Sequence, residues 1–128
     1  MDAISNMIIM LKNASISSRD SIFMPYSKLI ESLADCLVKE GYLKSVSKKS
    51  RKNKDVLELE IVYVEGKPRI TGVDRISKPS RRVYMGAKDI RSVKNGRGIL
   101  VLSTPKGILT DKEARKELVG GEAMFTMW

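Results

Sequence analysis

The stretch "LSTPKGILTDKEARKELVGGE", Leu102 to Glu122, contains the local features that decide how the second half of this chain folds. Thr110 and Glu113 have the spacing of a capping box, in which each residue accepts a hydrogen bond from the backbone amide of the other. We therefore predict a helix that begins after Thr110. Gly120 and Gly121 are expected to stop it after about two turns, because glycine adopts left-handed or strained backbone at little cost.

A helix of so few residues is not stable alone and must pack against the rest of the protein. That packing would fix Glu122 relative to the loop before the helix, which contains Ser103, Thr104, Lys106 and Gly107. Hydroxyl groups both donate and accept, lysine supplies charge, and glycine lets a partner approach the backbone closely. The motif therefore predicts a rigid polar surface for phosphate, ribose or base edges. Alternatively, the two hydroxyls satisfy only local backbone groups of the turn.

The N-terminal half predicts a small α+β layer of helix, strand, helix, strand and strand. Apolar residues at helical spacing, with Asp2 as N-cap, indicate a helix over roughly residues 3–13. The segment "SIFMPY" offers a short strand that Pro25 restricts to the edge or end of a sheet, and a second helix runs from Ser27 to Gly41. Period-two alternation on both sides of a basic tip, residues 50–54, then indicates a β-hairpin.

The turn at residues 65–68, Glu-Gly-Lys-Pro, is the expected boundary between two domains, residues 1–66 and residues 67–128. Beyond it the sequence predicts mostly short antiparallel strands with one short helix. The expected fold class is therefore α+β with two small domains. A chain of 128 residues is long enough to bury a core without disulfides.

The net charge of the chain is +9, and it lies almost entirely in the C-terminal half. Residues 1–66 carry ten Lys or Arg against nine Asp or Glu, whereas residues 67–128 carry fourteen against six. This excess predicts that a polyanion, most simply a nucleic acid, binds the C-terminal half. The alternative is a basic surface that serves only solubility.

The same composition argues against an enzyme. The chain has no histidine, and its one cysteine, Cys36, lies on or near the apolar face of the second predicted helix. Since neither paired carboxylates nor metal-ligand spacing occurs, we expect no catalytic residue, metal, cofactor or small-molecule substrate. A lone cysteine, no secretory segment and no apolar run of roughly 18 residues predict a cytoplasmic protein without a membrane partner.

Several ordered motifs carry a family resemblance. The stretch at 102–122 ends in Val-Gly-Gly-Glu and precedes a strand that closes on tryptophan, and the segment "RISKPSRRVY" occupies residues 75–84. The opening helix and the strand-to-helix segment at 25–28 match in the same order, through Asp2, Ile4, Met7, Asn13, Ala14, Pro25, Ser27 and Lys28. Together these segments closely resemble the bacterial form of the small-subunit ribosomal protein eight family.

The resemblance implies a two-domain α+β protein that binds a helical junction in the central domain of small-subunit ribosomal RNA early in ribosome assembly. In that family the C-terminal domain makes most of the RNA contact, among neighbouring small-subunit proteins. The same fold often represses translation of its own operon by binding a similar messenger RNA element. We therefore expect a structural constituent of the cytoplasmic ribosome. The alternative is an RNA-binding regulator that never enters a ribosome.

The resemblance also implies which residues contact RNA. They lie in the loop before the short helix, near the basic bend and after the glycine pair: Ser103, Thr104, Lys106, Gly107, Tyr84 and Glu122, with Arg81, Arg82 and Lys78 close by. Pro105 stands where the family usually has serine, which removes a hydroxyl and an amide donor, although its fixed φ would pre-shape the loop. Ser80 replaces a common glycine, so the bend is retained only if the φ of Ser80 is negative.

Three of these assignments have structural alternatives. Tyr84 is expected to stack on a base, or else to belong to the core as a strand residue. Glu122 accepts from a base amino group or a 2′-hydroxyl, or else forms only a salt bridge. The densest basic stretch, at the hairpin tip, is either a solvated face or a second RNA contact. Its residues are Lys48, Lys49, Arg51, Lys52 and Lys54.

Overall fold

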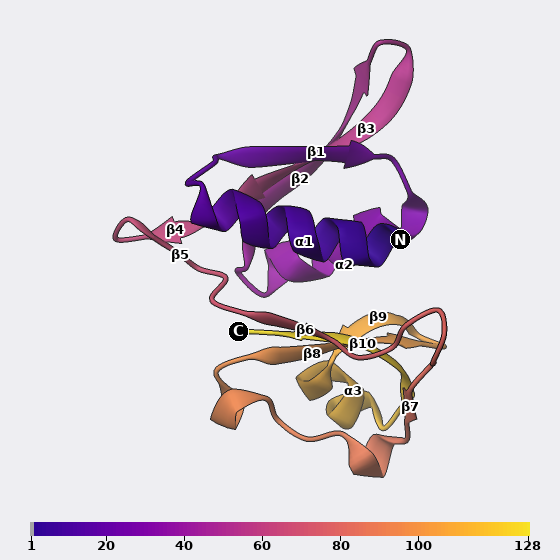
Figure 1. The fold of residues 1–128 in the computed structure, drawn as a ribbon. Coiled ribbons are helices and arrows are strands. Elements are labelled where there is room, and N and C mark those ends of the chain that lie inside the picture. Colours follow the sequence, from indigo (N-terminus) through magenta and orange to yellow (C-terminus); the bar gives the residue numbers. More distant parts are fainter. Residues whose placement is uncertain (1) are drawn as a thin grey trace. The chain divides into compact units, whose positions relative to one another are not determined.

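The structure, a computed structural model, describes residues 2–128 of the chain (Figure 1). The chain divides into two compact units, of which the first ends at Ile70 and the second runs from Thr71 to Trp128. Both combine helix with antiparallel sheet, which confirms the predicted α+β class. The assignment of residues 1–66 and 67–128 as the two domains stays a prediction.

The first unit is a three-stranded antiparallel sheet with two helices on one face (Figure 1). Its elements are α1 (Ala3–Ile16), β1 (Ser21–Pro25), α2 (Lys28–Lys39), β2 (Leu43–Arg51), β3 (Lys54–Ile61), β4 (Tyr63–Val64) and β5 (Lys67–Pro68). Strand β3 lies between β1 and β2, and β4 pairs with β5 in a separate small hairpin. Pro25 therefore ends an edge strand, as predicted.

Local capping sets the ends of both helices. Oδ1 of Asp2 accepts a hydrogen bond from the amide of Ser5 at 2.9 Å, which satisfies one of the free donors at the start of α1. The hydroxyl of Ser27 does the same for the amide of Ile30 at 3.4 Å. Gly41 follows the end of α2 with a φ of +82°, the left-handed conformation that glycine adopts readily. These caps confirm the expected start of α1 and both ends of α2, whereas α1 continues to Ile16, beyond the expected end near residue 13.

The β2–β3 hairpin also follows from the sequence. Leu57 and Leu59 are fully buried, while Glu58 lies half-buried on the opposite face of β3. Lys52 and Asn53 form the two-residue turn with φ values of 52° and 62°. Two positive φ values are typical of a type I′ turn, whose twist matches that of the paired strands. The predicted tip at residues 50–54 is therefore confirmed.

The second unit is an antiparallel sheet with the strand order β6-β10-β8-β9, and a short strand, β7, also pairs with β10. Its elements are β6 (Val73–Arg75), β7 (Tyr84–Met85), β8 (Ile99–Thr104), β9 (Gly107–Thr110), α3 (Asp111–Glu117) and β10 (Gly121–Met127), with 3₁₀ turns at Ala87–Asp89 and Lys94–Gly96. Strand β9 was not predicted from sequence. It pairs with β8 through a tight turn, and a stretch of only four residues is too short to reveal a strand by its own pattern.

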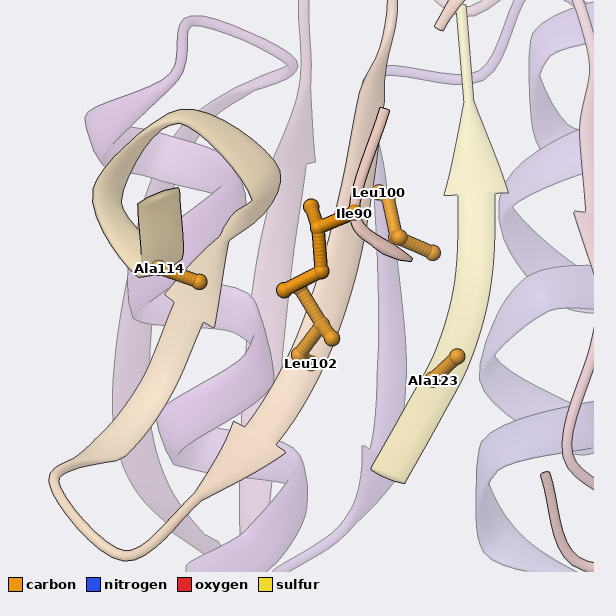
Figure 2. Close-up of a cluster of buried hydrophobic side chains, with 5 residues drawn as sticks. All are labelled: Ile90, Leu100, Leu102, Ala114 and Ala123. Atoms are coloured by element: carbon orange, nitrogen blue, oxygen red, sulfur yellow. The ribbon is translucent and has the colours of Figure 1, made fainter. Parts of the chain in front are cut away.

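A cluster of buried side chains joins α3 to the sheet (Figure 2). Ala114 projects from α3 towards Leu102 of β8, and Ala123 of β10 lies beside that strand, with Leu100 and Ile90 completing the cluster. Each of these five residues is no more than 3% exposed. This burial provides the packing that so short a helix needs, and it fixes α3 to the strands on both sides of it in sequence.

The capping box at the start of α3 is confirmed. The Thr110 hydroxyl accepts from the amide of Glu113 at 3.3 Å, and a carboxylate oxygen of Glu113 accepts from the amide of Thr110 at 3.1 Å. The end of the helix differs from the prediction. Leu118, not a glycine, adopts the left-handed conformation that ends α3, with a φ of 56°, and its side chain is exposed.

Gly120 and Gly121 have a different role from the one predicted. Neither has a positive φ, so they are not needed for left-handed backbone. A Cβ at Gly120 would lie 2.2 Å from the carbonyl oxygen of Met85, and a Cβ at Gly121 would lie 2.2 Å from that of Ser103. The glycine pair therefore lets β10 approach both neighbouring strands closely.

Candidate nucleic-acid interface

Three of the residues implied by the family resemblance form one row across the sheet of the second unit. Ser103 of β8 and Tyr84 of β7 are both paired with Glu122 of β10. Directly paired residues project from the same face of a sheet, and their neighbours in the chain project from the other. Because Leu102 and Ala123 belong to the core beneath α3, the row lies on the face opposite that helix.

The Glu122 carboxylate is held by two donors. The Ser77 hydroxyl and Nη1 of Arg82, the latter at 3.2 Å, both donate to Oε2 of Glu122. The Glu122 side chain is 17% exposed and that of Arg82 is 49% exposed, so the ion pair lies at the edge of the protein surface. The salt bridge considered as an alternative role for Glu122 is therefore present, and it leaves one carboxylate oxygen to other partners.

A loop at residues 76–83 carries three cations, of which Arg82 reaches this row. Both backbone groups of Ala123 close its base, because its carbonyl accepts from the amide of Ser77 at 3.0 Å and its amide donates to the carbonyl of Val83 at 2.9 Å. Lys78 and Arg81 close the tip through reciprocal backbone hydrogen bonds of 2.9 and 3.0 Å. Both cations are exposed, and the loop continues through Arg82 to Tyr84.

Ser80 lies at the tip of this loop, where the family commonly has glycine. It is not among the residues of the described chain that have a positive φ. The bend therefore tolerates a side chain at this position, and the substitution for glycine imposes no left-handed strain. Ser80 therefore meets the condition stated from the sequence, that the bend is retained only without a positive φ at this residue.

The β8–β9 turn presents the residues next to Ser103. Thr104 is paired with Gly107 across the turn, and Pro105 and Lys106 form the two-residue connection. The Thr104 hydroxyl donates to the Gly107 carbonyl at 2.8 Å and accepts from the Lys106 amide at 3.1 Å. The Thr104 hydroxyl therefore satisfies local backbone groups of the turn, which is the alternative role considered from sequence. Ser103 differs, because its hydroxyl has no hydrogen-bond partner within residues 2–128.

Pro105 fits the geometry of this turn. Proline fixes φ near −65°, which suits the first central position of a type I turn, and Lys106 at the second has no positive φ. Gly107 follows with a φ of +107°. The amide that proline lacks is not the one that closes such a turn. Compared with the usual serine, the substitution therefore removes a hydroxyl but leaves the turn intact.

Two acidic residues of α3 support the turn and the strand before it. Nζ of Lys106 lies 3.2 Å from a carboxylate oxygen of Glu117, in an exposed pair. Asp111 is 4% exposed, and its carboxylate accepts from the amide of Leu100 at 3.1 Å and from Arg115 at 3.1 Å. Strand β9 ends at Thr110, so Asp111 satisfies the β8 amide that lies beyond the end of the ladder.

Tyr84 is 71% exposed. This exposure excludes the core position considered from sequence and leaves the ring accessible beside Glu122. An exposed aromatic ring that follows a basic loop in the chain is a suitable surface for stacking with an unpaired base. Tyr84 therefore has the accessibility that its expected role requires.

The basic hairpin of the first unit is partly neutralised by its own neighbours. Lys49 forms an ion pair with Glu58, and the hydrogen bond from Lys49 lowers the pKa of that carboxyl below its usual value. Lys48 lies 3.6 Å from a carboxylate oxygen of Asp55. Lys48 also lies over the Tyr26 ring, at 4.4 Å from its centroid, and Arg51 lies over the Phe23 ring, at 4.3 Å from its centroid. Lys52 and Lys54 are exposed and form no ion pair within the described chain.

One residue of the site was not identified from sequence. Ser77 lies in the segment "RISKPSRRVY", but it is far from Glu122 in the chain and its link to that carboxylate becomes visible only in the fold. Among residues 2–128, no group of three metal-binding side chains lies together, and no helix is long and apolar enough to cross a membrane. The site therefore consists of cations, hydroxyls, one tyrosine and one oriented carboxylate.

Comparison with known proteins shows the family of this chain. The family model described as "Ribosomal protein S8" matches residues 2–128. The small ribosomal subunit protein uS8 of Persephonella marina is 44% identical over 99% of this chain and 98% of its own length. The protein of the same name from Ruegeria pomeroyi is 41% identical over 99% of this chain and 98% of its own length. The chain therefore belongs to the ribosomal protein S8 family.

Proposed function

We propose that this protein is a structural component of the small ribosomal subunit, where it binds ribosomal RNA directly and assists the assembly of the subunit. Membership of the ribosomal protein S8 family supports a structural, non-enzymatic role. The observation that carries direct RNA binding is the row of Ser103, Glu122 and Tyr84, bordered by exposed cations. The C-terminal location of the charge excess supports the same surface.

The side chains of this surface would make different kinds of contact with RNA. Lys78, Arg81 and Lys106 are exposed and would contact phosphates, which positions the RNA without reading its sequence. The Ser103 hydroxyl and the Tyr84 ring are suited to a ribose, a base edge or a base face. Glu122 would accept from a 2′-hydroxyl or an amino group, because a carboxylate repels phosphate. Shape and a few oriented contacts would therefore select one structured RNA site.

Two further activities extend this proposal. The same surface would bind a similar element in the messenger RNA of its own operon and repress translation, as the family resemblance suggests. The exposed Lys52 and Lys54 would contact a second RNA segment, since nothing within residues 2–128 neutralises them. Neighbouring small-subunit proteins would surround both contacts in the assembled particle.

Binding of the purified full chain to short hairpins tests the central proposal. We expect tight binding to a hairpin from the central domain of its own small-subunit RNA, with an affinity that falls as salt rises. Ser103→Ala should reduce the preference for this hairpin over a scrambled one with little change in salt dependence. Ser47→Ala, the same change at a half-buried strand position of the first unit, is the matched control. Equal affinity for both hairpins in the unmodified protein would refute direct recognition.

A separate measurement distinguishes a ribosomal protein from a free regulator. The tagged full chain should sediment with small subunits and remain there after a high-salt wash, because its binding is then part of an assembled particle. Removal by that wash would favour a regulator. Addition of the operon messenger element should displace the ribosomal hairpin from the purified protein. Failure of that competition would remove the repression proposal and leave the ribosomal one in place.

A further inference from the structure

Ser77 is a buried polar residue that the proposed RNA contacts do not use. Its exposed fraction is 0%, so it cannot touch RNA itself. Its hydroxyl donates to Oε2 of Glu122 and accepts from the amide of Val83 at 3.2 Å. A serine hydroxyl has one hydrogen to donate, and here that hydrogen is committed to the carboxylate.

The arrangement around Glu122 is asymmetric. Ser77 and Arg82 both donate to Oε2, whereas no donor within residues 2–128 reaches Oε1. Of the two donors, Arg82 is half-exposed on a flexible stem, while Ser77 is enclosed and anchored by a backbone hydrogen bond to Ala123. The serine is therefore the more rigid of the two supports.

We propose that Ser77 is a positioning residue for RNA recognition, because it fixes the Glu122 carboxylate so that Oε1 accepts a hydrogen bond from an RNA donor. The donor would be a base amino group or a ribose 2′-hydroxyl, the two kinds of RNA donor that a carboxylate accepts from. The inference rests on the proposed function, since it assigns a supporting group to that surface.

Fixing the carboxylate has a selective consequence. The Glu122 carboxylate is held beside Ser103 and Tyr84. There it favours binding of a nucleotide that donates a hydrogen bond, and it repels one that presents a phosphate or a carbonyl oxygen. A neutral serine orients the carboxylate without cancelling its charge, which a second arginine would do. Ser77 would thus contribute to preference among RNAs rather than to general affinity.

A double-mutant cycle separates this role from simple support of the loop, because Ser77 also satisfies the Val83 amide. The full chain is titrated with the central-domain hairpin and with its scrambled version. Ser77→Ala should weaken binding to the hairpin by about fivefold to tenfold, the loss expected when one charge-assisted hydrogen bond no longer orients its acceptor. In protein that already carries Glu122→Ala, the same change should have no effect.

Side-chain order in the free protein gives a second readout that does not depend on RNA. NMR relaxation of the Glu122 side chain should show greater mobility after Ser77→Ala. If that variant does not fold, Ser77→Cys replaces it, since a thiol is a weaker donor of similar size and predicts an intermediate loss. Equal losses with and without Glu122, no loss in either, or an unchanged Glu122 mobility would each overturn the inference. Equal binding of both hairpins by the unmodified protein would instead refute the proposed function.

Discussion

Replacing Gly121 with alanine tests whether the stability of the second unit depends on the close approach of β10 and β8. The new Cβ would lie 2.2 Å from the carbonyl oxygen of Ser103, whereas Cβ contacts below 3.0 Å essentially do not occur. The two strands must therefore separate locally by at least the difference, 0.8 Å, next to the Ser103–Glu122 pair. Both atoms belong to backbone or are attached to it, so no flexible side chain can absorb this shift.

Overpacking sets the loss in the free energy of unfolding that Gly121→Ala should cause. Forcing extra atoms into a closely packed site typically costs about 1–3 kcal/mol, and a clash with backbone belongs at the upper end, about 3 kcal/mol. For a unit of this size, each kcal/mol lowers the melting temperature by about 4–8 °C, so Gly121→Ala should lower it by about 12–24 °C. Trp128 is the only tryptophan in the chain and lies in the second unit, so its fluorescence reports unfolding of that unit.

Gly86→Ala is the matched control. Gly86 has a φ of −77°, and a Cβ there would meet its nearest atom, a carboxylate oxygen of Asp89, at an ordinary 3.5 Å. Alanine should be tolerated or should stabilise by about 0.4–1 kcal/mol, because it restricts the unfolded chain. If urea titrations followed by Trp128 fluorescence gave both variants the same stability, the argument from close strand approach would be wrong.

Three further predictions concern single contacts. Asp111→Ala should cost about 1–3 kcal/mol in urea unfolding, because the buried Leu100 amide loses its acceptor; wild-type stability would show that this hydrogen bond is dispensable. Tyr84→Ala should weaken hairpin binding by about 5- to 150-fold while Tyr84→Phe retains it, and equal losses in the two titrations would contradict stacking. Lys49→Ala should raise the pKa of Glu58 in an NMR titration, because the lysine hydrogen bond lowers it. A depressed folded-state pKa stabilises at pH above the usual carboxyl value and loses that contribution as the pH falls; an unmoved Glu58 titration would exclude Lys49 as the cause.

The sequence predicted best where the interaction is local. The Thr110–Glu113 capping box, the Ser27 cap and the glycine at 41 each depend on residues within one turn of a helix, so their spacing alone identifies them. The family resemblance supplied Ser103, Glu122 and Tyr84 as a set, and the structure brings those three into one row. The RNA contacts themselves stay predictions.

Prediction was weakest where the cause is a distant segment. The left-handed residue that ends α3 is Leu118, and the glycines after it are required by Met85 and Ser103, which approach from other strands. The link between Ser77 and Glu122 joins residues 45 apart in the chain. The basic hairpin was identified as a run of charge, but its pairing with Glu58 depends on strand register. No local pattern contains these partners.

The closed base of the 76–83 loop also provides a place to attach a probe. The two ends of the loop are both hydrogen-bonded to the backbone of Ala123. The exposed tip at Ser80 can therefore carry a reporter group without disturbing the position of Glu122. The native thiol, Cys36, is only 7% exposed, so Ser80→Cys would take a maleimide dye selectively under native conditions. Fluorescence from that position would follow the arrival of RNA in real time, beside the surface and outside its hydrogen-bonded row.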